Sequence, residues 1–189
     1  TGIRSPVFVF PSSFPVGNAR IFMPTDTPDL SFESRRMRRQ SLTRTIRKVA
    51  RACRRFADNG HRSLVVVASN RELQNFLERA QEEGVQVVSY GNGVSAKEAA
   101  QAFKEGQGEV LAGTSANYGE GVDLPRGLAS VIFFLRPGYP NPHDPQTIFE
   151  RRRFRNQSWP LHKWRVMIEA LQVRGRNIRS PEDCGVTIF

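Results

Sequence analysis

The last twenty residues of the chain, ALQVRGRNIRSPEDCGVTIF, hold the side chains best suited to chemistry. Gln172, Arg176 and Arg179 are four and then three residues apart, so a helix would place all three on one face. Two arginines held one turn apart present a rigid set of N–H donors that suits polyphosphate oxygens. Gly175 lies between them and lets a backbone or a phosphate approach, because glycine has no Cβ. A surface helix with solvated arginines is the alternative that this spacing leaves open.

A glycine-rich segment, GTSANYGEGVDLP over residues 113–125, follows a short apolar run that predicts a buried strand. Ligands of parallel α/β sheets bind at the carboxyl ends of the strands, where this segment would lie. Its glycines allow backbone amides to converge on an anion, and they are Gly113, Gly119 and Gly121. Thr114 and Ser115 add hydroxyl groups of the kind that meet phosphate oxygens. Asp123 can accept from a ribose hydroxyl, and Glu120 can hold the loop or orient a partner. Taken alone, the segment is equally compatible with a plain turn.

Strand and helix patterns alternate through the middle of the chain. Continuous apolar runs typical of buried parallel strands occupy residues 64–68, 85–90, 110–112 and 131–135. Helical periods occupy residues 40–59, 71–83 and 96–105. Ser69 with Glu72, and Ser95 with Glu98, are spaced as capping boxes at the start of the second and third helices. This order predicts an α/β domain in which helices flank a parallel sheet.

The C-terminal third adds a proline-rich loop, RPGYPNPHDP, and two more helical stretches at 146–158 and 160–173. The apolar side chains of the last stretch are expected to face inward, and they are Trp164, Met167, Ile168 and Leu171. Residues 186–189 predict a buried strand.

The loop YGNGVSA at 90–96 matches the dinucleotide pattern G-x-G-x-x-A between a strand and a helix. That pattern also requires an acidic residue at the end of the next strand, and this chain has Gly113-Thr114-Ser115 there. The Ser95–Glu98 box explains the loop without a cofactor. A nucleotide-dependent oxidoreductase is therefore a hypothesis that rests on this loop alone.

The net charge of +10 is unevenly distributed. Residues 35–62 carry eleven Arg or Lys and one acid, and residues 150–179 carry nine against two acids. Clustered positive charge of this kind favours a polyanionic partner, and nucleic acid in particular. The basic face of the 40–59 helix is compatible both with a solvated surface and with such a partner. A hydrophobic content of 39% excludes a disordered chain, and no apolar run is long enough for a transmembrane helix.

Two cysteines, Cys53 and Cys184, are too few for a disulfide framework or a thiolate metal site. Both have apolar neighbours and are expected in the core, which favours a reducing compartment. The three histidines have no metal-ligand spacing, so no metal site is predicted. The chain begins with Thr1, and we expect it to be a piece of a longer protein.

The two chemical segments together resemble a known family. G-T-S-x-x-Y-G-E-G-V-D-L-P, followed some fifty residues later by Q-x-x-G-R-x-I-R-x-x-x-D-x-G, resembles the fifth and sixth motifs of superfamily 2 helicases. The closest likeness is the C-terminal RecA-like domain of the XPD/DinG group of ATP-dependent DNA helicases. Residues 64–70 resemble the fourth motif, and PSSFPVGNARIF resembles the segment that leads into this domain. The resemblance implies a three-layer RecA-like fold, similar to P-loop NTPases but without the P-loop. It also implies that residues 1–34 lead into the domain and that residues 136–160 are a proline- and arginine-rich insertion.

The resemblance also assigns roles to individual residues. Arg176 and Arg179 would reach the γ-phosphate of ATP as arginine fingers, and Gln172 would touch the nucleotide or its attacking water. The other residues expected near ATP are Gly121, Asp123, Glu120 and Gly175. The residues expected to contact single-stranded DNA are Ser69, Asn70, Gly113, Thr114 and Ser115.

Several family motifs are absent from this chain. It contains no G-x-x-x-x-G-K-S/T loop, no D-E-x-H box and no set of four cysteines for an iron–sulfur cluster. The resemblance implies that a missing N-terminal RecA-like domain mainly holds ATP with Mg²⁺, and that any iron–sulfur cluster belongs to the full protein. The fragment alone is expected not to hydrolyse ATP. The expected partners are single-stranded DNA and that missing domain, with no membrane, in an intracellular location that is cytoplasmic and nucleoid-associated in a prokaryote. The alternative is a nucleic-acid-binding or nuclease-accessory module with a helicase-like fold and no motor activity.

Overall fold

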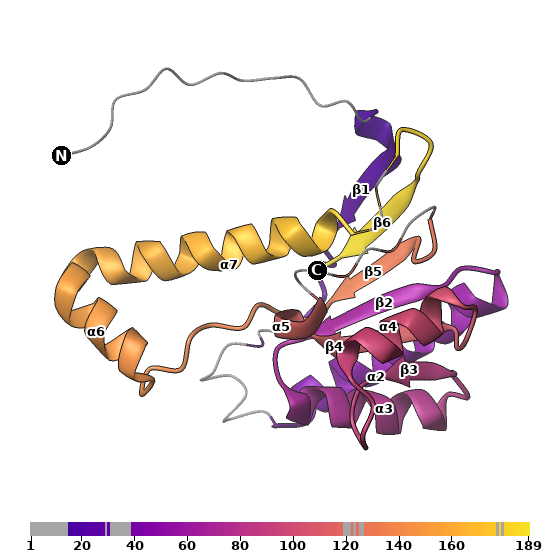
Figure 1. Ribbon diagram of the computed structural model, residues 1–189, viewed down its shortest axis with the longest axis horizontal. Coiled ribbons are helices and arrows are strands. Elements are labelled where there is room, and N and C mark those ends of the chain that lie inside the picture. The colour runs from indigo at the N-terminus through magenta and orange to yellow at the C-terminus, as the bar shows by residue number, and fades with distance from the viewer. Residues whose placement is uncertain are drawn as a thin grey trace.

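The computed structural model describes residues 15–28, 30, 39–118, 122, 124, 127–176, 178 and 180–189. Six strands in these residues form one parallel sheet in the order β1-β6-β5-β2-β4-β3 (Figure 1). The strands are β1 (Ala19–Phe22), β2 (Ser63–Val67), β3 (Val87–Ser89), β4 (Val110–Thr114), β5 (Val131–Phe134) and β6 (Gly185–Ile188). The α-helices are α2 (Arg39–Asp58), α3 (Asn70–Glu82), α4 (Ala96–Lys104), α5 (Ser115–Tyr118), α6 (Pro145–Phe154) and α7 (Ser158–Arg174). Two short 3₁₀ turns, η1 (Val16–Asn18) and η2 (Arg155–Gln157), complete the described elements.

The sheet separates two apolar layers, because successive side chains of a strand point to opposite faces. Alternate residues of the central strands, such as Val65 and Phe133, face α2 and α3 on one side. Their neighbours, such as Leu64 and Ile132, face α4, α5 and the end of α7 on the other side. The central strands β2, β4 and β5 are buried at every position. The predicted three-layer α/β architecture with a parallel sheet is therefore confirmed.

The edges of the sheet differ from the pattern in the sequence. The apolar run at 85–90 forms only the three-residue strand β3, whereas β4 continues to Thr114, two residues beyond its predicted end. The lead-in segment contributes a strand of its own, β1, which pairs with β6.

The predicted inward face of α7 is wrong. Trp164, Met167 and Leu171 are each at least half exposed, although they form a regular helical stripe. The reason is the length of the helix: only its last turns pack on the sheet, where Val173 is fully buried. The rest of α7 extends past the sheet and packs against α6 (Figure 1). There Glu150 is buried and accepts hydrogen bonds from Arg165 and His162.

The basic face of α2 is largely compensated within the chain. Arg47 pairs with Glu82 and Arg51 with Glu83, both at the end of α3. The remaining pairs are Lys48 with Asp26, and Arg54 with Asp58 and Glu109. Such exposed pairs are screened by solvent and contribute little to stability. Ion pairs within the chain therefore account for four of the cations on the α2 face, and binding of a polyanion to it stays a prediction.

Two smaller features complete the fold. Cys53 is buried as predicted, but Cys184 is exposed, because it lies in the turn before β6 and not in a packed element.

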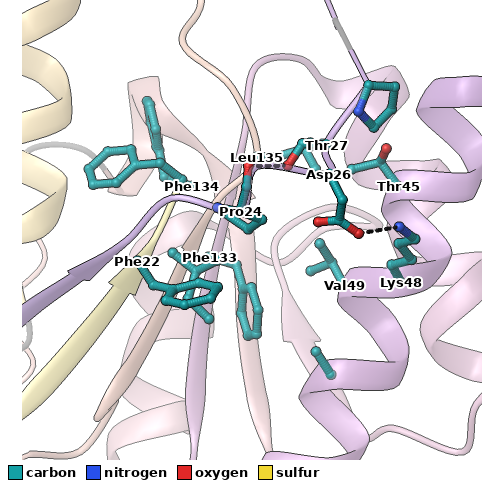
Figure 2. Close-up of a pocket in the computed structure, with 14 residues that line it drawn as sticks. Phe22, Pro24, Asp26, Thr27, Thr45, Lys48, Val49, Phe133, Phe134 and Leu135 are labelled. Atoms are coloured by element: carbon teal, nitrogen blue, oxygen red, sulfur yellow. Dashed lines mark hydrogen bonds and ion pairs between the residues drawn. The ribbon is translucent and has the colours of Figure 1, made fainter.

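A cavity of about 230 Å³ lies between α2 and the carboxyl ends of β1, β5 and β6 (Figure 2). Its walls are mostly aromatic and aliphatic, and the Asp26–Lys48 pair lies beside it. No helix of the described residues is long and apolar enough to cross a membrane.

Candidate functional site

The carboxyl edge of the sheet brings together residues that are far apart in the sequence. Asn70 begins α3 directly after β2, and Thr114 ends the neighbouring strand β4. Tyr90, which follows β3, connects them: its hydroxyl donates to Asn70 Oδ1 at 2.7 Å and lies 3.1 Å from Thr114 Oγ1. Asn117 Nδ2 also donates to Thr114 Oγ1, at 3.2 Å. Four polar side chains therefore form one connected hydrogen-bond network at this edge.

Sequence reasoning missed Tyr90 and Asn117 as members of this network. Tyr90 was expected to end a strand, and Asn117 carried no assigned role. Their positions in the sequence could have indicated them, because polar residues at the carboxyl ends of parallel strands lie at the edge of the sheet where ligands bind. The pairing of β3 with β4 decides that Tyr90 reaches Thr114.

Ser69 is fixed by the start of α3. Its hydroxyl accepts a hydrogen bond from the backbone N–H of Glu72 at 3.3 Å, as an N-cap does. The Glu72 carboxylate does not complete the predicted box: it accepts from the backbone N–H of Ala68 and pairs with Arg136. The Glu72–Arg136 pair, which is largely buried, ties the first turn of α3 to the loop after β5. By contrast, the Ser95–Glu98 capping box is complete, as predicted.

Gly113 has a packing reason to be glycine. A Cβ at this position would lie 2.3 Å from Cε2 of Tyr118, and such a distance is far inside van der Waals contact. Tyr118 is fully buried and packs edge-to-face against Tyr90. The glycine therefore makes room for the aromatic ring that fixes the first turn of the 113–125 segment. A contact between Gly113 and DNA remains a prediction beside this structural role.

The end of α7 meets the 113–125 segment. Arg176 Nη1 donates to the backbone oxygen of Val122 at 2.9 Å, across 54 residues of sequence. Gln172 and Ser115 line one cleft of about 440 Å³ between α5 and α7. The structure therefore brings the end of α7 and this segment together, through Gln172 with Ser115 and through Arg176 with Val122.

Four of the predicted site residues lie outside the described residues: Arg179, Gly121, Asp123 and Glu120. Gly175 is described, with φ −71°, a backbone conformation open to any residue. A Cβ there would make ordinary contacts, the nearest at 3.5 Å to the Gln172 oxygen. No described part of the chain therefore requires glycine at 175, and its approach to a phosphate stays a prediction.

The donor set of this edge suits phosphate oxygens. The exposed amide of Gln172 and the hydroxyl of Ser115 line the α5–α7 cleft, and the Arg176 guanidinium lies at the backbone of Val122. Ser69 and Asn70 add further polar groups at the end of β2, the strand next to β4. Among the described residues, no group of three or more His, Cys, Asp or Glu side chains could hold a metal ion. The side chains at this edge therefore include N–H and O–H groups that could donate to an anion, beside the Glu169 carboxylate in the same cleft.

Comparison with protein families identifies the domain. The model of the helicase C-terminal domain matches residues 53–189, which is well over half of the chain. The chain belongs to the helicase C-terminal domain family. The match includes both chemical segments and the β2–α3 junction with Ser69 and Asn70. A search of curated proteins finds no match.

Solved structures agree on the fold. A structure described as XPD in its apo form is 18% identical with a TM-score of 0.70, and the match covers 92% of this chain and 36% of that one. Xpd4 from S. tokodaii is 15% identical with a TM-score of 0.58, covering 90% of this chain and 33% of its own. Dbp5 from S. cerevisiae, solved bound to RNA and ADP BeF3, is 16% identical with a TM-score of 0.51, covering 93% and 35%. The helicase domain therefore has an XPD-like, RecA-like fold, and it spans about a third of the length of these structures.

Proposed function

We propose that this domain is the C-terminal half of an ATP-dependent DNA helicase motor. Arg176 and Arg179 would stabilise charge on a phosphoryl group held by an N-terminal RecA-like domain, and part of the single-stranded DNA track would run over the carboxyl edge. The observation that carries the proposal is the contact between Arg176 and Val122, which joins the end of α7 to the glycine-rich segment beside Gln172 and Ser115. Family membership supports the motor assignment at the coarser level of a helicase domain.

Arg176 and Gln172 suit different roles at the nucleotide. Arg176 lies at the end of α7, and its hydrogen bond to the backbone of Val122 holds the guanidinium at the loop instead of leaving it to rotate in solvent. Preorganised donors of this kind stabilise developing negative charge without reorganising. Gln172 is exposed one turn earlier, where it can hydrogen-bond a nucleotide or a water. In the whole protein, ATP with Mg²⁺ would supply the free energy for closure of the two domains, and Arg176 and Gln172 would bind and orient its terminal phosphate.

The proposed DNA contacts lie on the other side of the same edge. Ser69 caps α3, and Asn70 and Thr114 are joined through Tyr90, so the three side chains keep fixed relative positions. Hydroxyl and amide groups suit sequence-independent contacts with the phosphate backbone. Such contacts predict affinity that falls steeply as salt increases.

The test is the ATPase of the full-length protein, measured with and without single-stranded DNA, for wild type, Arg176→Ala and Arg176→Lys. Loss of an arginine finger lowers the turnover rate by about 10³–10⁵-fold. We expect Arg176→Ala to show this loss while its DNA affinity stays near the wild-type value. Arg176→Lys should also be slow, since lysine keeps the charge but not the planar set of donors.

Arg174→Ala is the matched control, because Arg174 lies two residues away at the end of the same helix. It should retain ATPase activity close to wild type. The 189-residue chain alone should show no ATPase activity. If single-stranded DNA does not stimulate ATP hydrolysis by the full-length protein, the motor proposal is wrong. That result would favour a nucleic-acid-binding module without motor activity.

A further inference from the structure

An exposed pair of aromatic rings lies beside the candidate DNA edge. Tyr139, in the proline-rich loop after β5, stacks on Trp159 in the first turn of α7, with ring centroids 5.3 Å apart and planes 18° apart. Tyr139 is 47% exposed and Trp159 is 53% exposed, so about half of each side chain stays open to solvent. Exposed stacked rings cost hydrophobic free energy unless a ligand covers them.

The pair lines an open groove of about 880 Å³. The groove also contains Ala68, Arg136, Leu30 and the prolines of the loop. Ala68 comes directly before Ser69, so the groove begins at the loop that we propose to contact DNA. The buried Glu72–Arg136 pair holds the two sides of this junction together. The aromatic pair and the proposed phosphate contacts are therefore parts of one continuous surface.

One cation lies beside the pair, and further cations precede Trp159 in the chain. Lys163 Nζ lies 5.6 Å from the centroid of the Trp159 ring. The preceding helix, α6, and the turn after it present exposed arginines to solvent, and these are Arg151, Arg152, Arg153 and Arg155. Positive side chains around exposed aromatic rings are the combination by which proteins bind single-stranded nucleic acid, because bases stack and phosphates pair. This charge favours a nucleic acid over a neutral proline-rich peptide, which an aromatic and proline-lined groove would otherwise suit.

We propose that Tyr139 and Trp159 form a stacking platform for a base of the single strand, with Lys163 contacting a neighbouring phosphate. The proposal rests on the proposed helicase function and extends its DNA track from the Ser69 loop to the start of α7. Stacking is independent of base identity, so the platform would bind without sequence preference.

The experiment measures binding of the full-length protein to a fluorescein-labelled oligothymidylate by fluorescence anisotropy. Trp159→Ala should weaken the affinity about 5- to 150-fold, the range that corresponds to about 1–3 kcal/mol per stacked base. Tyr139→Ala should weaken it similarly, while Trp159→Phe should recover most of the affinity because it keeps a flat ring. Phe149→Ala is the matched control: Phe149 is an exposed aromatic residue on α6 that does not line the groove.

The salt dependence separates stacking from a merely structural effect. Between about 50 and 200 mM NaCl, Trp159→Ala should keep the wild-type slope of log affinity against log salt, because it removes no phosphate contact. Lys163→Gln should reduce that slope by about 0.7, the value for one phosphate of a single strand. A Trp159→Ala protein whose slope falls as well would indicate a collapsed surface and overturn the stacking assignment.

The outcomes also separate this inference from the proposed function. Equal affinity of wild type and Trp159→Ala, in a protein with DNA-stimulated ATPase, overturns the platform alone and leaves the groove to another occupant such as a peptide. If the wild-type protein binds the oligonucleotide but does not hydrolyse ATP, the proposed motor function is wrong. The affinities of the variants still test the stacking platform in that case.

Discussion

Replacing Gly113 by alanine tests how the glycine-rich segment is built. The added Cβ would lie 2.3 and 2.4 Å from two ring atoms of Tyr118 and 3.0 Å from the ring of Tyr90. Neither ring is free to move away: Tyr118 is fully buried, and the two rings pack edge-to-face with centroids 6.0 Å apart. The Tyr118 hydroxyl also donates to the Ala96 oxygen at 3.3 Å. Gly113 pairs in the middle of the sheet, between β2 and the end of β3, so the backbone cannot yield easily.

The magnitude follows from this crowding. Overpacking a tight core costs about 1–3 kcal/mol, and we expect Gly113→Ala to lower the free energy of unfolding by that amount. Tyr118→Ala creates a cavity instead and should cost about 3–5 kcal/mol, as other aromatic truncations do. In the double variant, the new methyl group occupies space that the ring has left. The double variant should therefore be about 1–3 kcal/mol more stable than the sum of the single changes predicts.

Urea denaturation followed by circular dichroism measures all three variants, with the midpoint and the slope fitted separately. Gly17→Ala is the control, because a Cβ on Gly17 meets nothing within 4 Å. We expect the control to lie within about 0.5 kcal/mol of wild type. The packing argument would be refuted if Gly113→Ala were as stable as wild type. It would also be refuted if the two single changes in the free energy of unfolding simply added in the double variant.

Two further predictions test the α6–α7 hairpin and the corrected burial of a cysteine. Hydrogen bonds from Arg165, and then from Gln146 and His162, lower the pKa of Glu150 below its ordinary value of 4.5. The stability that this carboxylate contributes should be present above about pH 4.5 and be lost as the pH falls through the lowered pKa. Thermal melting from neutral to acidic pH should show this loss in wild type and less of it in Glu150→Gln, and identical pH profiles would contradict the assignment. Burial raises the pKa of the Cys53 thiol far above its ordinary value, whereas Cys184 is exposed. Iodoacetamide should therefore modify Cys184 alone in the native protein at neutral pH, as mass spectrometry of its peptides can show; native labelling of Cys53 would contradict the burial.

The fold could be predicted from the sequence because its signals are local. Continuous apolar runs and helical periods reflect burial on both faces of a strand or on one face of a helix, and each needs only neighbouring residues. The prediction for α7 failed because it, too, used only residues that are neighbours in the sequence. A stripe of Trp164, Met167 and Leu171 shows that one face is apolar, but it does not show whether any element covers that face. Cys184 failed similarly, since apolar neighbours in sequence are not neighbours in the core.

Only part of the candidate site could be predicted in this way. The spacing of Gln172 and Arg176 and the composition of residues 113–125 indicated anion binding. In the structure Gln172 shares a cleft with Ser115, and Arg176 contacts Val122. Tyr90 and Asn117 escaped notice, because a single tyrosine or asparagine has no distinctive spacing. Their role depends on which strands lie side by side.

The sequence by itself determined the helicase family, the alternation of strands and helices, and the residues with phosphate chemistry. These depend on residue types and spacings, which the chain carries before it folds. Tertiary structure alone decided that Tyr90 joins Asn70 to Thr114, that Glu72 pairs with Arg136, and that Tyr139 stacks on Trp159. Each of these contacts joins residues twenty or more positions apart. Strand order and loop path set such distances, and no local pattern of residues encodes either of them.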